Sequence, residues 1–274
     1  HDVIPVSHPQ YYRAGWREEF AHNVSEALRN FDSVITISHY TANMLRRLYP
    51  REAAAARIAV CHNGLEQLSG SGNPDIAPQA LRNQTLPPFL MVGTIEPKKG
   101  HLLALRVLEQ LWDEGLVQRN LVILGRKGWM YDEIVAALKS SRHASRIIWL
   151  SDADDATLAF AYRQAHLLIH ASEVEGFGLP MIESADLGTP VVARRSEIAS
   201  EVLGEFGIYF DGERPESLRD VLLDLESGPR HQEIRGALRR FKWPEWQAVA
   251  PALFARLKDQ AEGRRDLPEA IIPE

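Results

Sequence analysis

Hydrophobic residues along this chain gather in short continuous runs, and segments with helical spacing of apolar residues lie between these runs. In the longest such region the runs are FLMV at 89–92, NLVILG at 120–125, RIIWL at 146–150, LLIHAS at 167–172, TPVVAR at 189–194 and GIYF at 207–210. A continuous apolar run between polar turns is typical of a strand buried on both faces. The strict alternation of strands and helices predicts an α/β fold with a doubly wound parallel sheet.

The first 68 residues show a shorter version of this pattern. It predicts a helix over Tyr11–Asn30, a strand ending at Ser38, a helix over 40–49 and a strand within 57–64. The polar stretch Ser69–Pro88, rich in Gly, Ser and Pro, then predicts a linker. The predicted division is therefore 1–68, a linker at 69–88, a complete domain at 89–241, and a terminal helix and tail at 242–274.

Nine residues, Glu175–Glu183 (EGFGLPMIE), join a predicted strand to a predicted helix. Pro180 suits the first turn of that helix, which puts Gly176 and Gly178 in the preceding turn. Glycines let a backbone approach a ligand closely, and a helix N-terminus favours an anion. The two glutamates can accept hydrogen bonds from hydroxyls, so the segment predicts a site for a sugar joined to phosphate. The simpler alternative is one acid that complements the helix dipole and one solvated loop acid.

A second polar turn, Gly93–Gly100, follows the predicted strand at 89–92. It holds Lys98 and Lys99 at the carboxyl end of that strand, and open α/β sheets bind ligands at this edge. The flexible backbone and the two ammonium groups therefore predict a ligand-binding turn. The alternative is an ordinary solvated basic turn.

Together, EGFGLPMIE and VGTIEPKKG resemble two signatures of the retaining GT-B glycosyltransferases of family 4, which use nucleotide sugars. The resemblance implies that Glu175 contacts hydroxyls of the donor sugar and that Glu183 contacts the ribose of the nucleotide. It also implies that the amides around Gly178 and Leu179 face the phosphate.

The basic turn departs from the family pattern at two places. Many relatives carry Arg after the first Gly, where this chain has Thr94, and an Arg-Lys pair where it has Lys98 and Lys99. Lysine neutralises phosphate as a point charge but lacks the bidentate fork of arginine. The resemblance therefore implies Lys99 as the first diphosphate ligand and Lys98 as the second, with Gly93 and Thr94 beside them.

The resemblance implies two further site positions. It places the nucleotide base near the end of the RIIWL strand, where backbone groups of Leu150 are available. His1 matches a family histidine in the cleft between domains, near the donor, although a chain-terminal residue could equally be a tag remnant. The catalytic set implied is Glu175, Lys99 and His1.

Other polar residues have simpler interpretations. Asp152–Asp155 could be mistaken for an Asp-x-Asp metal motif, but their place before a predicted helix favours N-capping by Asp154 or Asp155. His170 is expected to be a buried core histidine. Glu201 resembles a glutamate of the family, or else is a helix-surface acid.

The family architecture also interprets the two ends of the chain. HDVIPVSHPQYY and RIAVCHNG resemble the end of the N-terminal, acceptor-side domain, and FKWPEWQAVAPALFARLKD resembles a terminal helix that crosses back to it. The resemblance thus implies one complete C-terminal donor-binding domain and only the last part of an N-terminal domain.

Composition narrows the class of partners. The net charge of −6 gives no reason to expect nucleic acid, and the single cysteine, Cys61, cannot form an internal disulfide. No apolar run approaches membrane-spanning length, and no signal peptide is visible. We expect a cytoplasmic protein, with peripheral association with the inner face of the membrane through sequence outside this chain as a further option.

The resemblance implies transfer of a hexose from a nucleotide diphosphate sugar to a hydroxyl of a glycan or lipid-linked glycan, with retention and without a metal. VGTIEPKKG is similar to bacterial surface-polysaccharide mannosyltransferases, so GDP-mannose is the first donor to consider and UDP- or ADP-glucose stays open. The alternative is a nucleotide-sugar-binding fragment or subunit, inactive without an acceptor domain. A hydrolase ranks third, because Glu175 and Glu183 flank a turn and do not form a facing pair.

Overall fold

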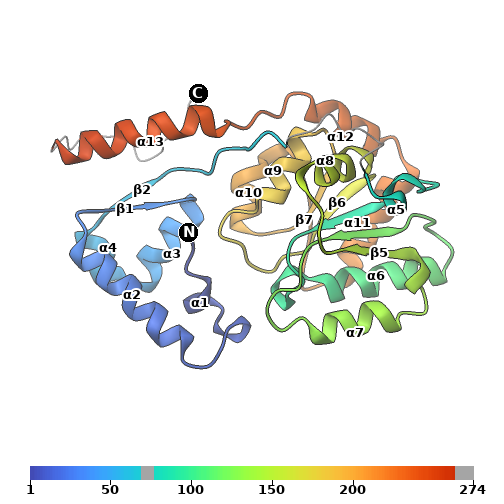
Figure 1. Ribbon diagram of the computed structural model, residues 1–274, viewed down its shortest axis with the longest axis horizontal. Helices are drawn as coiled ribbons and strands as arrows, with labels where there is room; N and C mark the ends of the chain where they lie inside the picture. Colours follow the sequence, from blue (N-terminus) through green and yellow to red (C-terminus); the bar gives the residue numbers. More distant parts are fainter. Residues whose placement is uncertain (69–76, 263–274) are drawn as a thin grey trace. The chain divides into compact units, whose positions relative to one another are not determined.

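The computed structural model describes residues 1–68 and 77–262, which form two compact units (Figure 1). Unit 1 comprises His1–Gln67, Val174–Gly178 and the chain from Trp243 onward. Unit 2 comprises Leu68–Glu173 and Leu179–Lys242. The boundary between the units therefore passes through the nine-residue segment, between Gly178 and Leu179.

Unit 2 is built on a six-stranded sheet in which all neighbouring strands are parallel. Its strands are β3 (Phe89–Val92), β4 (Leu121–Leu124), β5 (Ile147–Leu150), β6 (Leu167–His170), β7 (Val191–Arg194) and β8 (Gly207–Phe210). The strand order is β5-β4-β3-β6-β7-β8, so the direction of winding reverses between β3 and β6. This is the strand order typical of dinucleotide-binding doubly wound folds, and it confirms the predicted fold class.

Helices cover both faces of this sheet (Figure 1). They are α5 (Gln79–Arg82), α6 (His101–Asp113), α7 (Asp132–Ser140), α8 (Asp155–Gln164), α9 (Leu179–Asp186), α10 (Glu197–Leu203), α11 (Pro215–Ser227) and α12 (Arg230–Leu238). Short 3-10 turns lie at Pro97–Lys99, Ala144–Arg146 and Gly204–Phe206. Leu108 of α6 and Leu222 of α11 share one core cluster with Phe89 and Ile123 of the sheet. The four central strands, β3, β4, β6 and β7, are almost entirely buried, as their continuous apolar sequences predict. The edge strands β5 and β8 are only partly buried.

Unit 1 contains a two-stranded parallel sheet of β1 (Ser33–Thr36) and β2 (Arg57–Val60). Its helices are α1 (Ile4–Ser7), α2 (Trp16–Asn30), α3 (His39–Leu48), α4 (Pro50–Ala55) and α13 (Trp246–Ala261), with a 3-10 turn at Pro9–Tyr11. A small core of Val3, Leu28, Leu45 and Tyr49 joins α2 and α3 to the two strands, whose Val34 and Ile58 pack against it. Among the described residues of either unit, no helix combines the length and the apolar character that crossing a bilayer requires.

Three local predictions can be compared with these bounds. The helix predicted from Tyr11 begins only at Trp16, because Gly15 has a φ of +84° and ends the preceding turn in the left-handed region. The predicted strand ends at Thr36 because Ser38 serves as the N-cap of α3. Asp154 caps α8 by accepting a hydrogen bond from the Thr157 amide, as predicted.

The predicted linker, Ser69–Pro88, falls partly outside the described residues, which omit 69–76. Its described part includes the short helix α5.

Candidate functional site

The strand order brings the two sequence signatures to the same edge of the sheet. β3 and β6 are neighbours, with Phe89 paired to Leu167, and the sheet reverses its winding between them. Ligands of open α/β sheets bind outside the carboxyl ends of strands at such a switch point. The basic turn Gly93–Gly100 leaves the carboxyl end of β3, and the nine-residue segment follows β6.

The basic turn is fixed to the end of β6 by close backbone contacts. Gly100 has a φ of +72°, and a Cβ atom there would clash with the carbonyl oxygen of Ala171. The Glu173 amide also donates a hydrogen bond to the Lys98 carbonyl, with 2.8 Å between nitrogen and oxygen. Glycine at position 100 is therefore required for the turn to pass this close to the neighbouring strand.

The two lysines of the turn have different surroundings. The Lys98 ammonium lies 3.3 Å from a carboxylate oxygen of Glu96, and both side chains are mostly buried. The Lys99 side chain passes over Gly93, with its Cε 3.7 Å from where a Cβ of residue 93 would lie.

His101 follows this turn as the first residue of α6 and is only 2% exposed. Burial, helped by the positive charge of Lys99, lowers its pKa to about 4. The imidazole is therefore neutral at pH 7 and adds no further charge behind the lysines. The sequence reasoning did not single out His101, although its place directly after Lys-Lys-Gly was a usable signal.

Glu183 lies one turn inside α9, where the sequence predicted it. Its carboxylate accepts a hydrogen bond from the hydroxyl of Tyr162 on α8, at 2.8 Å. Burial, together with the nearby Glu183 charge, raises the pKa of Tyr162 well above its ordinary value, so this hydroxyl stays a donor. The sequence did not predict a role for Tyr162, because a tyrosine within an apolar helix has the pattern of a core residue.

The phosphate-facing positions lie at the start of α9. Gly178 has a φ of +91°, and Leu179 is the first residue of the helix, with 39% of its surface exposed. A left-handed glycine directly before a helix lets the chain turn sharply into it. The first amides of a helix have no acceptors within it, which suits them to an anion.

The first four residues of the nine-residue segment, Glu175–Gly178, belong to unit 1 together with the preceding Val174. The Ser38 hydroxyl, which is fully buried, donates a hydrogen bond to the Gly176 carbonyl at 2.9 Å. Phe177 is 3% exposed, and its ring centroid lies 5.7 Å from that of Trp243. Residues far apart in the sequence thus hold this segment within unit 1.

The predicted His1 lies beside the same segment. Its carbonyl accepts a long hydrogen bond, 3.5 Å, from the Thr41 hydroxyl of α3. Asp2, the next residue, packs so closely against Gly176 that a Cβ on Gly176 would lie 2.8 Å from the Asp2 Cβ. The structure therefore brings the start of the chain and the Glu175 segment together in unit 1, and adds Asp2, which the sequence reasoning had not selected.

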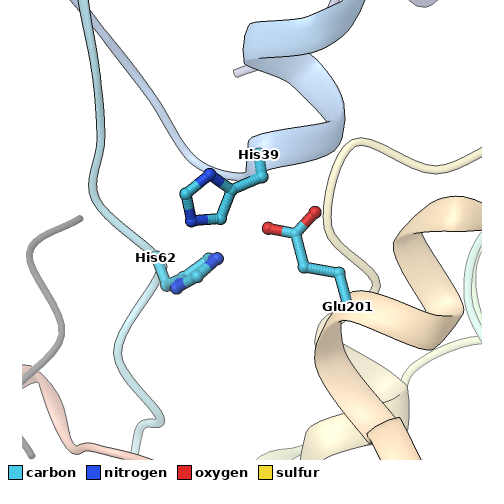
Figure 2. Close-up of side chains that lie close together, drawn as sticks. All are labelled: His39, His62 and Glu201. Atoms are coloured by element: carbon cyan, nitrogen blue, oxygen red, sulfur yellow. The ribbon is translucent and has the colours of Figure 1, made fainter. Parts of the chain in front are cut away.

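Two histidines of unit 1 extend this packing (Figure 2). His39 opens α3, and its ring meets His62 edge-on with centroids 5.6 Å apart. His62, 6% exposed, in turn lies 5.8 Å from Phe177 between ring centroids. Glu201, also drawn in Figure 2, lies on α10 of unit 2.

The predicted base-binding position, Leu150, is the last residue of β5. Its carbonyl accepts a hydrogen bond from the Gly125 amide at 3.0 Å, so this group already has a partner in the protein. The neighbouring Trp149 donates its indole N–H to the Gly125 carbonyl at 2.8 Å. His170, at the end of β6, is buried, as expected for a core histidine.

The known proteins to which this chain is similar include glycosyltransferases. Residues 73–239 match the family model described as glycosyl transferases group 1. The serotype-specific mannosyltransferase WbdA of Escherichia coli is 30% identical over 94% of this chain, which spans 33% of that protein. The O-antigen chain mannosyltransferase B of Escherichia coli is 24% identical over 89% of the chain, which spans 65% of it.

Among solved structures, a sucrose-phosphate synthase from Thermosynechococcus elongatus superposes with a TM-score of 0.74 at 20% identity, covering 96% of this chain and 65% of that one. This likeness supports the GT-B fold. Since the family model covers more than half of the chain and both signature segments follow the strands at the switch point, the chain belongs to the group 1 glycosyltransferases.

Proposed function

We propose that this chain takes part in transfer of mannose from GDP-mannose to a hydroxyl of a glycan or lipid-linked glycan, with retention of configuration. The observation that carries the proposal is the meeting of the basic turn with the strand that leads into EGFGLPMIE, at the switch point of the sheet. The choice of mannose is supported by two related mannosyltransferases, at 30% and 24% identity. The name of the second relative, an O-antigen chain mannosyltransferase, supports a surface polysaccharide as product, and we extend the proposal to action at the cytoplasmic face of the membrane.

The proposed chemistry is mainly electrostatic. As the bond between the sugar and the diphosphate breaks, negative charge grows on the leaving group, and Lys99, Lys98 and the first amides of α9 stabilise it. Glu175 orients the sugar, and Glu183 holds the ribose. The acceptor attacks from the face that the diphosphate leaves, and a donor phosphate oxygen assists removal of its proton. This scheme uses neither a protein nucleophile nor a metal ion.

A second candidate is a donor-binding module that depends on further sequence for transfer. It is favoured by one fact, that the chain spans about a third of the length of WbdA. In this case nucleotide sugar binds, but transfer requires acceptor-side residues outside the chain.

The test is calorimetric titration of the chain with GDP, UDP and ADP and with their sugar conjugates, in EDTA. We expect GDP and GDP-mannose to bind most tightly, and Lys99→Ala to weaken GDP binding by about tenfold, a loss typical of a charged contact to phosphate. Lys139→Ala removes an exposed lysine of α7 and serves as the matched control.

Transfer of mannose to an acceptor by the chain alone would favour the complete transferase, and donor binding without transfer would favour the module. Failure of all three nucleotides to bind would contradict both candidates.

A further inference from the structure

Tyr162 makes a contact with the candidate site that a structural role alone does not require. Its side chain lies in α8 and is completely buried, yet its hydroxyl reaches the Glu183 carboxylate at 2.8 Å. A phenylalanine would fill the same space, so the hydroxyl serves the hydrogen bond and not the packing. The bond is also charge-assisted, which makes it stronger than a bond between neutral groups.

The backbone of Tyr162 is fixed as firmly as its side chain. The Thr189 hydroxyl donates a hydrogen bond to the Tyr162 carbonyl at 2.6 Å. The Ser184 hydroxyl donates to the Thr189 carbonyl at 3.1 Å, and the Thr189 amide donates to the Ser184 carbonyl at 2.9 Å. Ser184 and Thr189 are both fully buried. This connected network joins α8 to α9 and leaves the tyrosine little freedom to move.

The fixed tyrosine hydroxyl restricts the side chain of Glu183. This glutamate is only partly buried and lies on α9, a helix of eight residues. A glutamate side chain has several rotamers, and ordering it on binding costs free energy. A donor fixed at one carboxylate oxygen selects one of these rotamers before the ligand arrives.

We propose that Tyr162 is a positioning residue for the nucleotide, acting through Glu183 to present its carboxylate to the ribose hydroxyls. This inference rests on the proposed function, because it assumes that Glu183 meets a ribose. It adds a residue of α8 whose hydroxyl governs nucleotide affinity without touching the nucleotide.

The experiment compares two ligands on two proteins. GDP and 2′,3′-dideoxy-GDP are titrated into the wild-type chain and into Tyr162→Phe, which deletes one oxygen atom. We expect Tyr162→Phe to weaken GDP binding by about tenfold, as expected for loss of a bond to a charged group. Binding of dideoxy-GDP, which lacks the ribose hydroxyls, should change by less than about twofold, within the range of substitutions that touch no relevant feature.

Tyr209→Phe is the matched control, because it also deletes a tyrosine hydroxyl that donates a hydrogen bond within unit 2. Tyr209 lies on β8, and its hydroxyl donates to the Gly204 carbonyl at 2.7 Å. It should leave both affinities unchanged. A second variant, Glu183→Ala, should weaken GDP binding, and adding Tyr162→Phe to it should cause no further loss, because the tyrosine then has nothing to position.

The positioning role would be overturned if Tyr162→Phe weakened the binding of GDP and dideoxy-GDP equally, or if it left GDP binding unchanged. In either case the proposed function would stand as long as the wild-type chain binds GDP. A lowered melting temperature with additive losses in the double variant would indicate a structural role and would also overturn it. Absence of GDP, UDP and ADP binding by the wild-type chain would instead reject the proposed function, and this inference with it.

Discussion

The two halves of the nine-residue segment are held by different means. Val174–Gly178, with Glu175, belongs to unit 1, where a buried serine bonds the Gly176 carbonyl and an aromatic ring packs between His62 and Trp243. From Leu179 on, the segment belongs to unit 2, where Tyr162 bonds the carboxylate of Glu183 directly. Backbone hydrogen bonding and ring packing thus contribute to positioning the first half, and the hydrogen bond from Tyr162 contributes to positioning the second.

Because the two halves are held differently, the proposed role of Glu175 on the sugar and that of Glu183 on the ribose can be tested separately. Glu175 can be displaced without any change to its own side chain, by loosening the contacts of residues 176 and 177. We expect loss of the Tyr162 hydroxyl to disturb the orientation of Glu183 while its helix stays in place. We therefore expect substitutions at the residues that hold the first half to lower the free energy of unfolding. Substitutions at the contact that holds Glu183 should instead lower the affinity for the nucleotide.

The largest effect is expected for Phe177→Ala in the first half. Phe177 is 3% exposed and packs against two rings, so its truncation leaves a cavity in unit 1. We expect a loss of about 4 kcal/mol in the free energy of unfolding, measured by urea titration with tryptophan fluorescence. Phe254→Ala, at a ring on α13 that is 69% exposed, is the control and should change stability by less than about 0.5 kcal/mol. Equal losses for both variants would contradict the packing role.

The next effect separates the two glutamates by function. Glu175→Ala should lower transfer at least about 100-fold, which corresponds to about 2.7 kcal/mol, because the sugar loses its orienting group. Its affinity for GDP should stay within about twofold of the wild type, since GDP carries no sugar for Glu175 to bind.

Glu183→Ala should show the reverse pattern, with GDP binding weakened by about tenfold. Calorimetry gives the affinities, and a radiolabelled GDP-mannose assay in the presence of an acceptor gives the rates. The same loss of GDP affinity in both variants would remove the distinction between the halves.

Much of the fold could be predicted from the sequence, because the central strands of the sheet in unit 2 are buried on both faces. Leu90 and Ile123 are fully buried, and runs of such residues identify strands to within about two residues of their ends. The predicted start of α2 was wrong because Gly15, in the left-handed region, ends the preceding turn. The helical spacing of apolar residues carries no information about such a backbone dihedral angle.

The site was harder to predict because its supporting contacts are remote in sequence. Ser38 lies 138 positions from Gly176, and Tyr162 lies 21 positions from Glu183. Locally, Ser38 has the signature of an N-cap and Tyr162 that of a core residue, and both descriptions are correct as far as they go. Only the strand order and the resulting crossings of the chain reveal the second role of each side chain.

Ser38→Ala tests the backbone anchor of the first half. The variant loses the N-cap of α3, where Ser38 accepts from the Thr41 amide at 3.0 Å, and leaves the Gly176 carbonyl without this donor. We expect a loss of about 2 kcal/mol in stability, together with faster hydrogen exchange in a peptide covering 174–178.

Ser196→Ala is the matched control, because Ser196 caps α10 by accepting from the Ala199 amide in unit 2. It should cost about 1 kcal/mol and leave exchange at 174–178 unchanged. Ser38→Thr keeps both the acceptor and the donor and should restore slow exchange. If Ser38→Ala and Ser196→Ala gave the same exchange profile at 174–178, the anchor would be refuted.

The smallest effect concerns the response of unit 2 to acid. Burial, with the charge of Arg119, lowers the pKa of His166 to about 3, and the pKa of His101 is lowered to about 4. Since an unfolded histidine has a pKa of about 6.5, the folded state binds fewer protons below that value. Stability from these groups is therefore complete above pH 6.5 and declines as the pH falls toward 4 and 3. From pH 7 to pH 6, each histidine should cost about 0.7 kcal/mol.

His166→Phe should reduce this decline, because it removes one of the titrating groups and keeps a ring stacked on His231, whose centroid lies 3.9 Å away. Burial also lowers the pKa of His231, so part of the decline should remain. His22→Gln, at an exposed position of α2 in unit 1, should leave the decline unchanged. Urea titrations at pH 7 and pH 6 measure the difference. Since the histidines with these lowered pKa values lie in unit 2, acid should weaken the support of Glu183 before that of Glu175. An unaltered pH dependence in His166→Phe would show that this asymmetry has another source.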